Sequence, residues 1–172
     1  MNDAHLHLLV NHFPIIGPIL GLGILIVGII LKNNSVKNTA YSLFIVSAIF
    51  AAFSMGTGDG AEHAVNNLPG VTKELIHTHE GYAEKLAILL YVLGIISIGG
   101  IYLSFKNHPK SKLVSYSILF VSIVGVFIAQ KVGTSGGEVR HTEIRSNALQ
   151  TVGATQNTAV EDHEIKKDDD EK

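Results

Sequence analysis

The sequence predicts an all-α fold: an integral membrane four-helix bundle followed by a polar tail. This prediction rests first on four long apolar stretches, which are Leu8–Leu31, Tyr41–Met55, Leu86–Phe105 and Leu113–Gln130. A helix needs about 20 apolar residues to cross the hydrocarbon of a bilayer. The first, third and fourth stretches approach or exceed this length without Asp, Glu, Lys or Arg, and the second runs on uncharged as far as Asp59. We therefore expect four membrane-spanning helices.

The composition is the second observation. Charged residues make up 16% and hydrophobic residues 47% of the chain, whereas a soluble domain carries about a quarter charged residues. The alternative is a soluble bundle of buried helices. Against it, Ile15–Leu31 and Leu86–Phe105 are apolar on all sides and leave no polar stripe to face water.

The chain divides into a transmembrane domain, residues 1–146, and a polar tail, residues 147–172. The tail ends in Glu161–Lys172, where charge dominates and little can be buried, so we expect it to be disordered. The chain has no cysteine, which excludes disulfides, thiolate metal sites and c-type haem attachment. A cleavable signal peptide is not expected, because the first apolar stretch is too long and lacks a basic segment before it.

Several residues predict where helices begin and bend. Thr72 is a suitable N-cap for a long third helix, and Asp3 for the first. If the first helix is continuous from Ala4, His5 and His12 share a face. Pro14 is expected in the first turn of a helix, where a missing N–H costs little, and Pro18 is expected to bend the helix. Glycines in the first, third and fourth helices allow close packing in lipid.

The lysines predict the orientation. The two loops 32–39 and 106–112 contain no acid and hold the lysines Lys32, Lys37, Lys106, Lys110 and Lys112. Short loops rich in lysine face the cytoplasm. Both termini and the opposite ends of the helices are then extracytoplasmic.

Histidines gather at those opposite ends, where a shared polar site is the leading interpretation. The residues at the four ends are His5, His7, His12, His63, His77, His79 and His141. We expect four of them to face inward: His12, His63, His79 and His141. His77 is the alternative to His79, because residues two apart on a helix point about 200° apart. We expect His5 and His7 to be interfacial, and His108 and His163 to lie outside any site.

Two carboxylates accompany these histidines at helical spacing. Asp59 precedes His63 by four residues and could orient its ring, as partners of metal-ligating histidines do. Glu138 precedes His141 by three residues. Ionisable groups near a membrane are functional candidates because burying them is costly. The competing interpretation is that these histidines are solvated residues at helix ends.

Three short motifs resemble an uncharacterised bacterial family of four-helix membrane proteins. They are His12-Phe13-Pro14 opening the first helix, Gly56-Thr57-Gly58-Asp59 closing the second, and Gly136-Gly137-Glu138 with His141 closing the fourth. The resemblance covers about residues 5–145 and implies the fold and a place in the bacterial cytoplasmic (inner) membrane, with several crossings. It implies no activity. Arg140 departs from it, since family members tend to show an aromatic residue there.

Three functions are compatible with such a site. The first is b-type haem held by two of His12, His63, His79 and His141, for electron transfer with a redox partner at the outer face. The second is a first-row transition metal (Fe, Cu or Zn). Its candidate ligands are His12, Asp59, His63, His77, Glu138 and His141. The third is a non-catalytic subunit or scaffold that joins other membrane subunits. No nucleophile–base pair or nucleic-acid footprint is visible, so a stand-alone enzyme is not expected.

Overall fold

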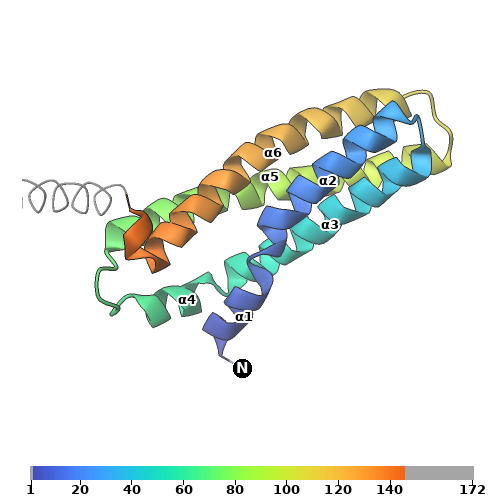
Figure 1. Cartoon of the computed structure of the whole chain (residues 1–172). Helices are drawn as coiled ribbons and strands as arrows, with labels where there is room; N and C mark the ends of the chain where they lie inside the picture. The colour runs from blue at the N-terminus through green and yellow to red at the C-terminus, as the bar shows by residue number, and fades with distance from the viewer. Residues whose placement is uncertain (1, 146–172) are drawn as a thin grey trace, which may run out of the picture.

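The computed structural model describes residues 2–145 as a bundle of four long helices with two short helices at one end (Figure 1). The elements are α1 (Asp3–Val10), α2 (Phe13–Ile30), α3 (Asn34–Gly56), α4 (Gly58–Val65), α5 (Lys73–Phe105), α6 (Ser111–Arg140) and the 3-10 helix η1 (Thr142–Ile144). Four helical segments are long and apolar enough to cross a membrane, with α1 and α2 together forming the first. The predicted all-α four-helix membrane bundle is confirmed. The predicted tail, residues 147–172, lies outside the described residues.

The four long helices pack as an antiparallel ring. α2 lies against α3, α3 against α5, α5 against α6, and α6 returns to α2. The α2–α3 and α5–α6 turns share one end, which we call the lysine end (Figure 1). At the other end, the histidine end, α5 begins and α6 ends, α1 packs on α4 and on α3, and η1 packs on α6 (Figure 1).

Small residues allow the helices to approach closely. A Cβ on Gly21 would lie 2.5 Å from the buried Phe44 ring, and one on Gly94 would lie 2.9 Å from Ala48. In lipid, such contacts supply dispersion energy that the hydrophobic effect cannot. The outer faces carry large apolar side chains; Ile95 and Phe120 are each 69% exposed. An apolar exterior of this kind is suited to lipid contact.

The first membrane segment is broken before Pro14. α1 ends at Val10, and α2 begins at Phe13, so Pro14 stands in the first turn of α2 as predicted. Pro14 cannot donate to the Val10 carbonyl four residues earlier, and its ring would clash with that group. The break therefore lies before Pro14, while Pro18 is accommodated inside α2.

The other helix boundaries extend beyond the apolar stretches. α3 begins at Asn34, seven residues before Tyr41, because the Asn33 side chain accepts hydrogen bonds from two amides of its first turn. The predicted N-cap Thr72 is confirmed, with its hydroxyl accepting from the Leu75 amide at 3.3 Å. The first helix is capped by Asn2, not Asp3. Apolar length alone cannot reveal such polar first turns.

α5 and α6 are longer than a membrane crossing requires. At 1.5 Å per residue, their 33 and 30 residues span about 50 and 45 Å, against about 30 Å of hydrocarbon. Their apolar parts, Leu86–Phe105 and Leu113–Gln130, lie toward the lysine end. The surplus turns extend at the histidine end, where they form a polar layer.

A candidate histidine site

Two half-buried histidines from different helices lie in that polar layer. His7 lies on α1 and His79 on the first turns of α5. Each ring is held by a helix other than its own, His7 by the end of α3 and His79 by α6. They are the best candidates for a shared site at this end.

The His7 ring is held by the end of α3. Its Nδ1 lies 3.1 Å from the carbonyl oxygen of Ser54 and 3.2 Å from the hydroxyl oxygen of Thr57. A carbonyl oxygen can only accept, so Nδ1 carries the hydrogen and donates it. The Thr57 hydroxyl donates its own hydrogen to the carbonyl of Phe53 at 2.9 Å, and it therefore also accepts from His7.

The His79 ring is held by α6 in the same way. Its Nδ1 lies 3.1 Å from the hydroxyl oxygen of Ser135. That hydroxyl has a single hydrogen, which it donates to the carbonyl of Val132 at 3.2 Å. With its hydrogen on the Val132 carbonyl, the Ser135 hydroxyl accepts, and His79 Nδ1 donates.

The two rings therefore share one tautomer. With Nδ1–H engaged by protein oxygens, the Nε2 atom of His7 and of His79 is left with a free lone pair. Ligating histidines are held in this way, with one ring nitrogen donating to a carbonyl or hydroxyl and the other bound to a metal. The pair can accept a metal ion, the iron of a cofactor, or a proton.

Gly136 gives the His79 ring its place against α6. A Cβ built at this position would lie 2.9 Å from His79 Cε1 and 3.3 Å from Nδ1. A side chain at this position would therefore displace the His79 ring. The first glycine of the double-glycine motif therefore has a physical role in the site.

The expectation that His12, His63 and His141 turn inward is wrong, because all three side chains are exposed. The His12 ring turns back to the Leu8 carbonyl of its own segment at 3.2 Å. His63 stands on α4 four residues after Asp59, which is exposed as well.

The expectation that only one of His77 and His79 faces inward is confirmed. His77 is exposed and contacts Glu80 at 3.2 Å, while His79 is half-buried against Ser135. The two histidines lie on opposite sides of α5 because they are two residues apart in a helix.

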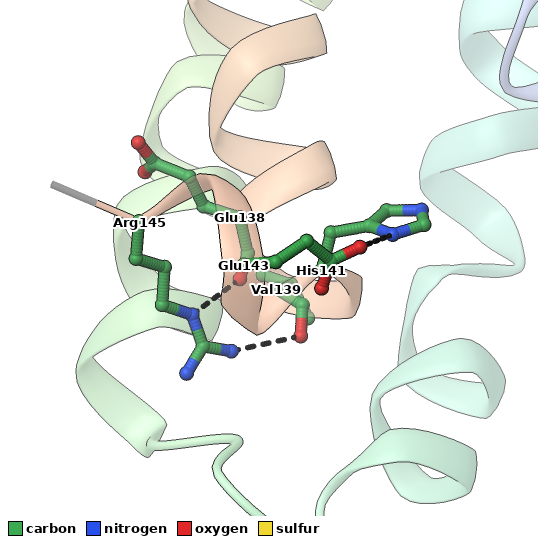
Figure 2. A network of polar contacts seen from close by, with 5 residues as sticks. All are labelled: Glu138, Val139, His141, Glu143 and Arg145. Carbon is green, nitrogen blue, oxygen red and sulfur yellow. Dashed lines mark hydrogen bonds and ion pairs between the residues drawn. The ribbon is translucent and has the colours of Figure 1, made fainter. Parts of the chain in front are cut away.

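Glu138 and His141 do not converge. Figure 2 shows the Glu138 carboxylate and the His141 ring pointing in opposite directions. The ring instead donates to the Glu143 carboxylate at 2.9 Å. The amide of Glu143 itself, as the larger cause, and then this contact lower the pKa of Glu143 from its ordinary value. Within residues 2–145, no group of three or more His, Asp or Glu side chains is close enough to hold a metal ion.

Arg145 closes the histidine end. Its guanidinium donates to the Glu138 carbonyl at 2.8 Å and to the Val139 carbonyl at 3.3 Å (Figure 2). A third bond, of 2.6 Å, reaches the Gly70 carbonyl in the turn before α5. The last carbonyls of α6, which lack partners within the helix, are satisfied by this fork.

His7 was expected to be interfacial, and the structure corrects this. A continuous first helix would fix the directions of His7 and His12 together, but the break before Pro14 makes α1 a separate helix with its own direction. α1 packs on α4 through Asp3 and Gly60 and so turns His7 toward Thr57. Only Pro14 could have indicated this break in the sequence, because a helix tends to end before a proline.

The chain matches no family model, no curated protein and no solved structure. The resemblance drawn from its three motifs therefore stays a prediction. Structural roles for parts of two motifs come from the contacts above: Pro14 begins α2, and Gly136 seats His79.

Proposed function

We propose that the protein binds b-type haem through His7 and His79 and transfers electrons at the outer face of the membrane. The observation that supports this most is the pair of free Nε2 lone pairs, each on a ring whose Nδ1–H is already engaged. Both rings are thereby oriented before any ligand binds, which lowers the cost of binding.

The number of protein donors favours haem over a bare metal ion. A porphyrin supplies four nitrogen ligands and needs only one or two axial side chains, whereas structural or catalytic zinc takes three or four ligands from the protein. His7 and His79 suffice for haem iron. A first-row metal ion at the same pair would need water or other small molecules to complete its coordination.

Bound haem would supply one-electron chemistry, and this chain would orient it and limit access to it. His7 and His79 would ligate the iron, while Thr57 and Ser135 hold their rings. His108 is an exposed residue of the α5–α6 turn, so the proposal includes no second haem at the lysine end. Electrons would pass to a partner on the same side of the membrane.

The proposed location is the bacterial cytoplasmic membrane, with the lysine end in the cytoplasm and both termini outside. The lysine bias supports this orientation. A reporter fused after Lys172 is expected to behave as extracytoplasmic, and one inserted in the 33–38 segment as cytoplasmic. The reverse pattern would move the histidine site to the inner face.

The test is spectroscopy on the full chain purified in mild detergent. We expect a reduced-minus-oxidised spectrum with sharp visible haem bands, and near-stoichiometric iron in the same sample. The double variant His7→Ala/His79→Ala should lose both while remaining in the membrane. Stoichiometric copper or zinc without haem bands would assign a two-histidine metal site. A sample that contains no haem and no stoichiometric metal would overturn the proposal. The histidine cluster would then have a scaffold role.

A further inference from the structure

The lysine end carries a concentrated positive charge that the described protein does not neutralise. Its lysines are Lys32, Lys37, Lys106, Lys110 and Lys112. Every Asp and Glu among residues 2–145 lies at the histidine end: Asp3, Asp59, Glu62, Glu74, Glu80, Glu84, Glu138 and Glu143. The compensating anions for the lysine end must therefore come from outside the described residues.

Lys37 is the unusual member of this group, because it is only 8% exposed. Its stem crosses Gly28 of α2, where an added Cβ would lie 2.8 Å from the Lys37 Cγ atom. Within the described part of the chain, no carboxylate pairs with its ammonium group. Lys37 stands one turn before Tyr41, whose hydroxyl lies 2.7 Å from the Ser115 hydroxyl of α6. Lys37 therefore lies on the side of α3 that faces the start of α6 and Lys112. A buried lysine stem beside further lysines, with no carboxylate partner among the described residues, favours an anion there.

The start of α6 offers hydrogen-bond donors beside the same two lysines. Lys110, the N-cap residue, makes no side-chain hydrogen bond to the first turn. Among residues 2–145, the amides of Lys112 and Leu113 have no acceptor, whereas Asn33 engages two amides at the start of α3. Free amides at a helix N-terminus bind phosphate through their N–H groups and the helix dipole.

We propose that Lys37, Lys112 and the first turn of α6 bind the phosphate group of an anionic phospholipid. Two cations and free amides match a phosphate oxyanion. A lipid is favoured over a free phosphate compound because Leu113, beside the free amides, is 67% exposed, and Leu31, at the end of α2, is 63% exposed. These apolar side chains can contact acyl chains while the headgroup meets the lysines. This site is at the opposite end from the histidine pair and does not depend on it.

The experiment measures lipid binding to the delipidated full chain in detergent by native mass spectrometry. The probes are dioleoyl phosphatidylglycerol, dioleoyl phosphatidylcholine and inorganic phosphate. We expect phosphatidylglycerol to bind more tightly than phosphatidylcholine. Each of Lys37→Gln and Lys112→Gln should weaken phosphatidylglycerol binding about fivefold, the effect of removing one lysine near an anionic headgroup.

Lys106→Gln is the matched control, since it removes an exposed lysine from the same end and leaves the Lys37–Lys112 pair intact. If Lys37→Gln does not fold, Lys112→Gln carries the test, because its side chain is exposed. If inorganic phosphate competes fully with the lipid, the site binds phosphate but is assigned to free anions, and the lipid proposal is overturned. Equal binding of both lipids, or equal losses in all three lysine variants, would overturn the proposal.

Discussion

The histidine end and the lysine end of this bundle solve different structural problems. At the lysine end, α2 and α5 stop abruptly in tight turns. After α2, Lys32 adopts a φ of 51°, and the amides of Lys32 and Asn33 bond the carbonyls of Ile29 and Gly28. Asn107, with a φ of 48°, closes α5 in the same way. These are Schellman closures, which use only backbone groups to end a helix.

The histidine end is built from longer helices and additional ones. α5 and α6 continue past their apolar parts, α1 packs on α4 and α3, and η1 packs on α6. This extra layer half-buries the rings of His7 and His79 among hydroxyl and carbonyl acceptors. This comparison shows that a turn between two helices of the bundle needs only a few residues. Orienting the two imidazole rings requires residues from α1, α3, α5 and α6.

The largest expected effect comes from Gly136→Ala at the histidine end. The added Cβ would displace the His79 ring from Ser135. Loss of such an orienting contact lowers the affinity of a ligating histidine for its metal about 10–100-fold. Haem titration of the apo-protein measures this effect. Gly133→Ala is the control, because a Cβ there meets only Ile15, at 4.0 Å; equal affinities for the two variants would contradict the assigned role of Gly136.

Gly28→Ala tests the packing next to the lysine end. The new Cβ would lie 2.8 Å from the backbone nitrogen of Lys37, so α2 and α3 would have to separate. Overpacking of this kind lowers the free energy of unfolding by about 1–3 kcal/mol. Unfolding in detergent measures it, with Gly23→Ala as control because its Cβ would meet nothing within 4 Å. A destabilised Gly23→Ala would mean that helix propensity, not the α2–α3 contact, decides the result.

Arg145→Ala opens the closure of the histidine end. The carbonyls of Glu138, Val139 and Gly70 would lose their shared donor. We expect unfolding to become easier by about 1–2 kcal/mol, as for a charged donor in a partly exposed site. Thermal unfolding in detergent checks this. Arg140→Ala removes an exposed cation from the same helix end and should lower the free energy of unfolding less. An equal decrease in the two variants would show that Arg145 acts through its charge and not through its hydrogen bonds.

Asn33→Ala is expected to have the smallest effect. It removes the side chain that accepts from the Ser35 and Val36 amides at 2.9 and 3.2 Å. Loss of such an N-cap costs about 1 kcal/mol. The unfolding midpoint of Asn33→Ala, compared with that of the exposed neighbour variant Asn34→Ala, measures it. Identical midpoints would show that the turn is fixed by the Schellman closure alone.

The sequence predicts the membrane part of this fold well, because apolar length is a local property. It also predicts Thr72 as an N-cap and the opposite directions of His77 and His79, since both follow from the chemistry of one helix. The break between α1 and α2 was not foreseen, and it decides which histidine of the first segment faces inward.

The partners of His7 and His79 could not be predicted. Ser54 contributes its backbone carbonyl and Thr57 its hydroxyl near the end of α3, and Ser135 is one of several serines in α6; nothing local distinguishes these residues. Their roles arise only when α1, α3, α5 and α6 meet. Similarly, the inward directions assigned to His12, His63 and His141 needed a knowledge of side-chain packing that helix ends alone do not supply.

The central claim is that His7 and His79, and not their neighbours, hold the ligand. The most direct measurement compares the reduced-minus-oxidised spectra of His5→Ala, His7→Ala, His77→Ala and His79→Ala purified side by side. Each pair shares a helix and differs in burial: His5 and His77 are exposed, while His7 and His79 are half-buried. We predict that the haem bands are lost or shifted in His7→Ala and His79→Ala and unchanged in His5→Ala and His77→Ala. Unchanged bands in all four variants, or equal losses within each pair, would contradict the assignment.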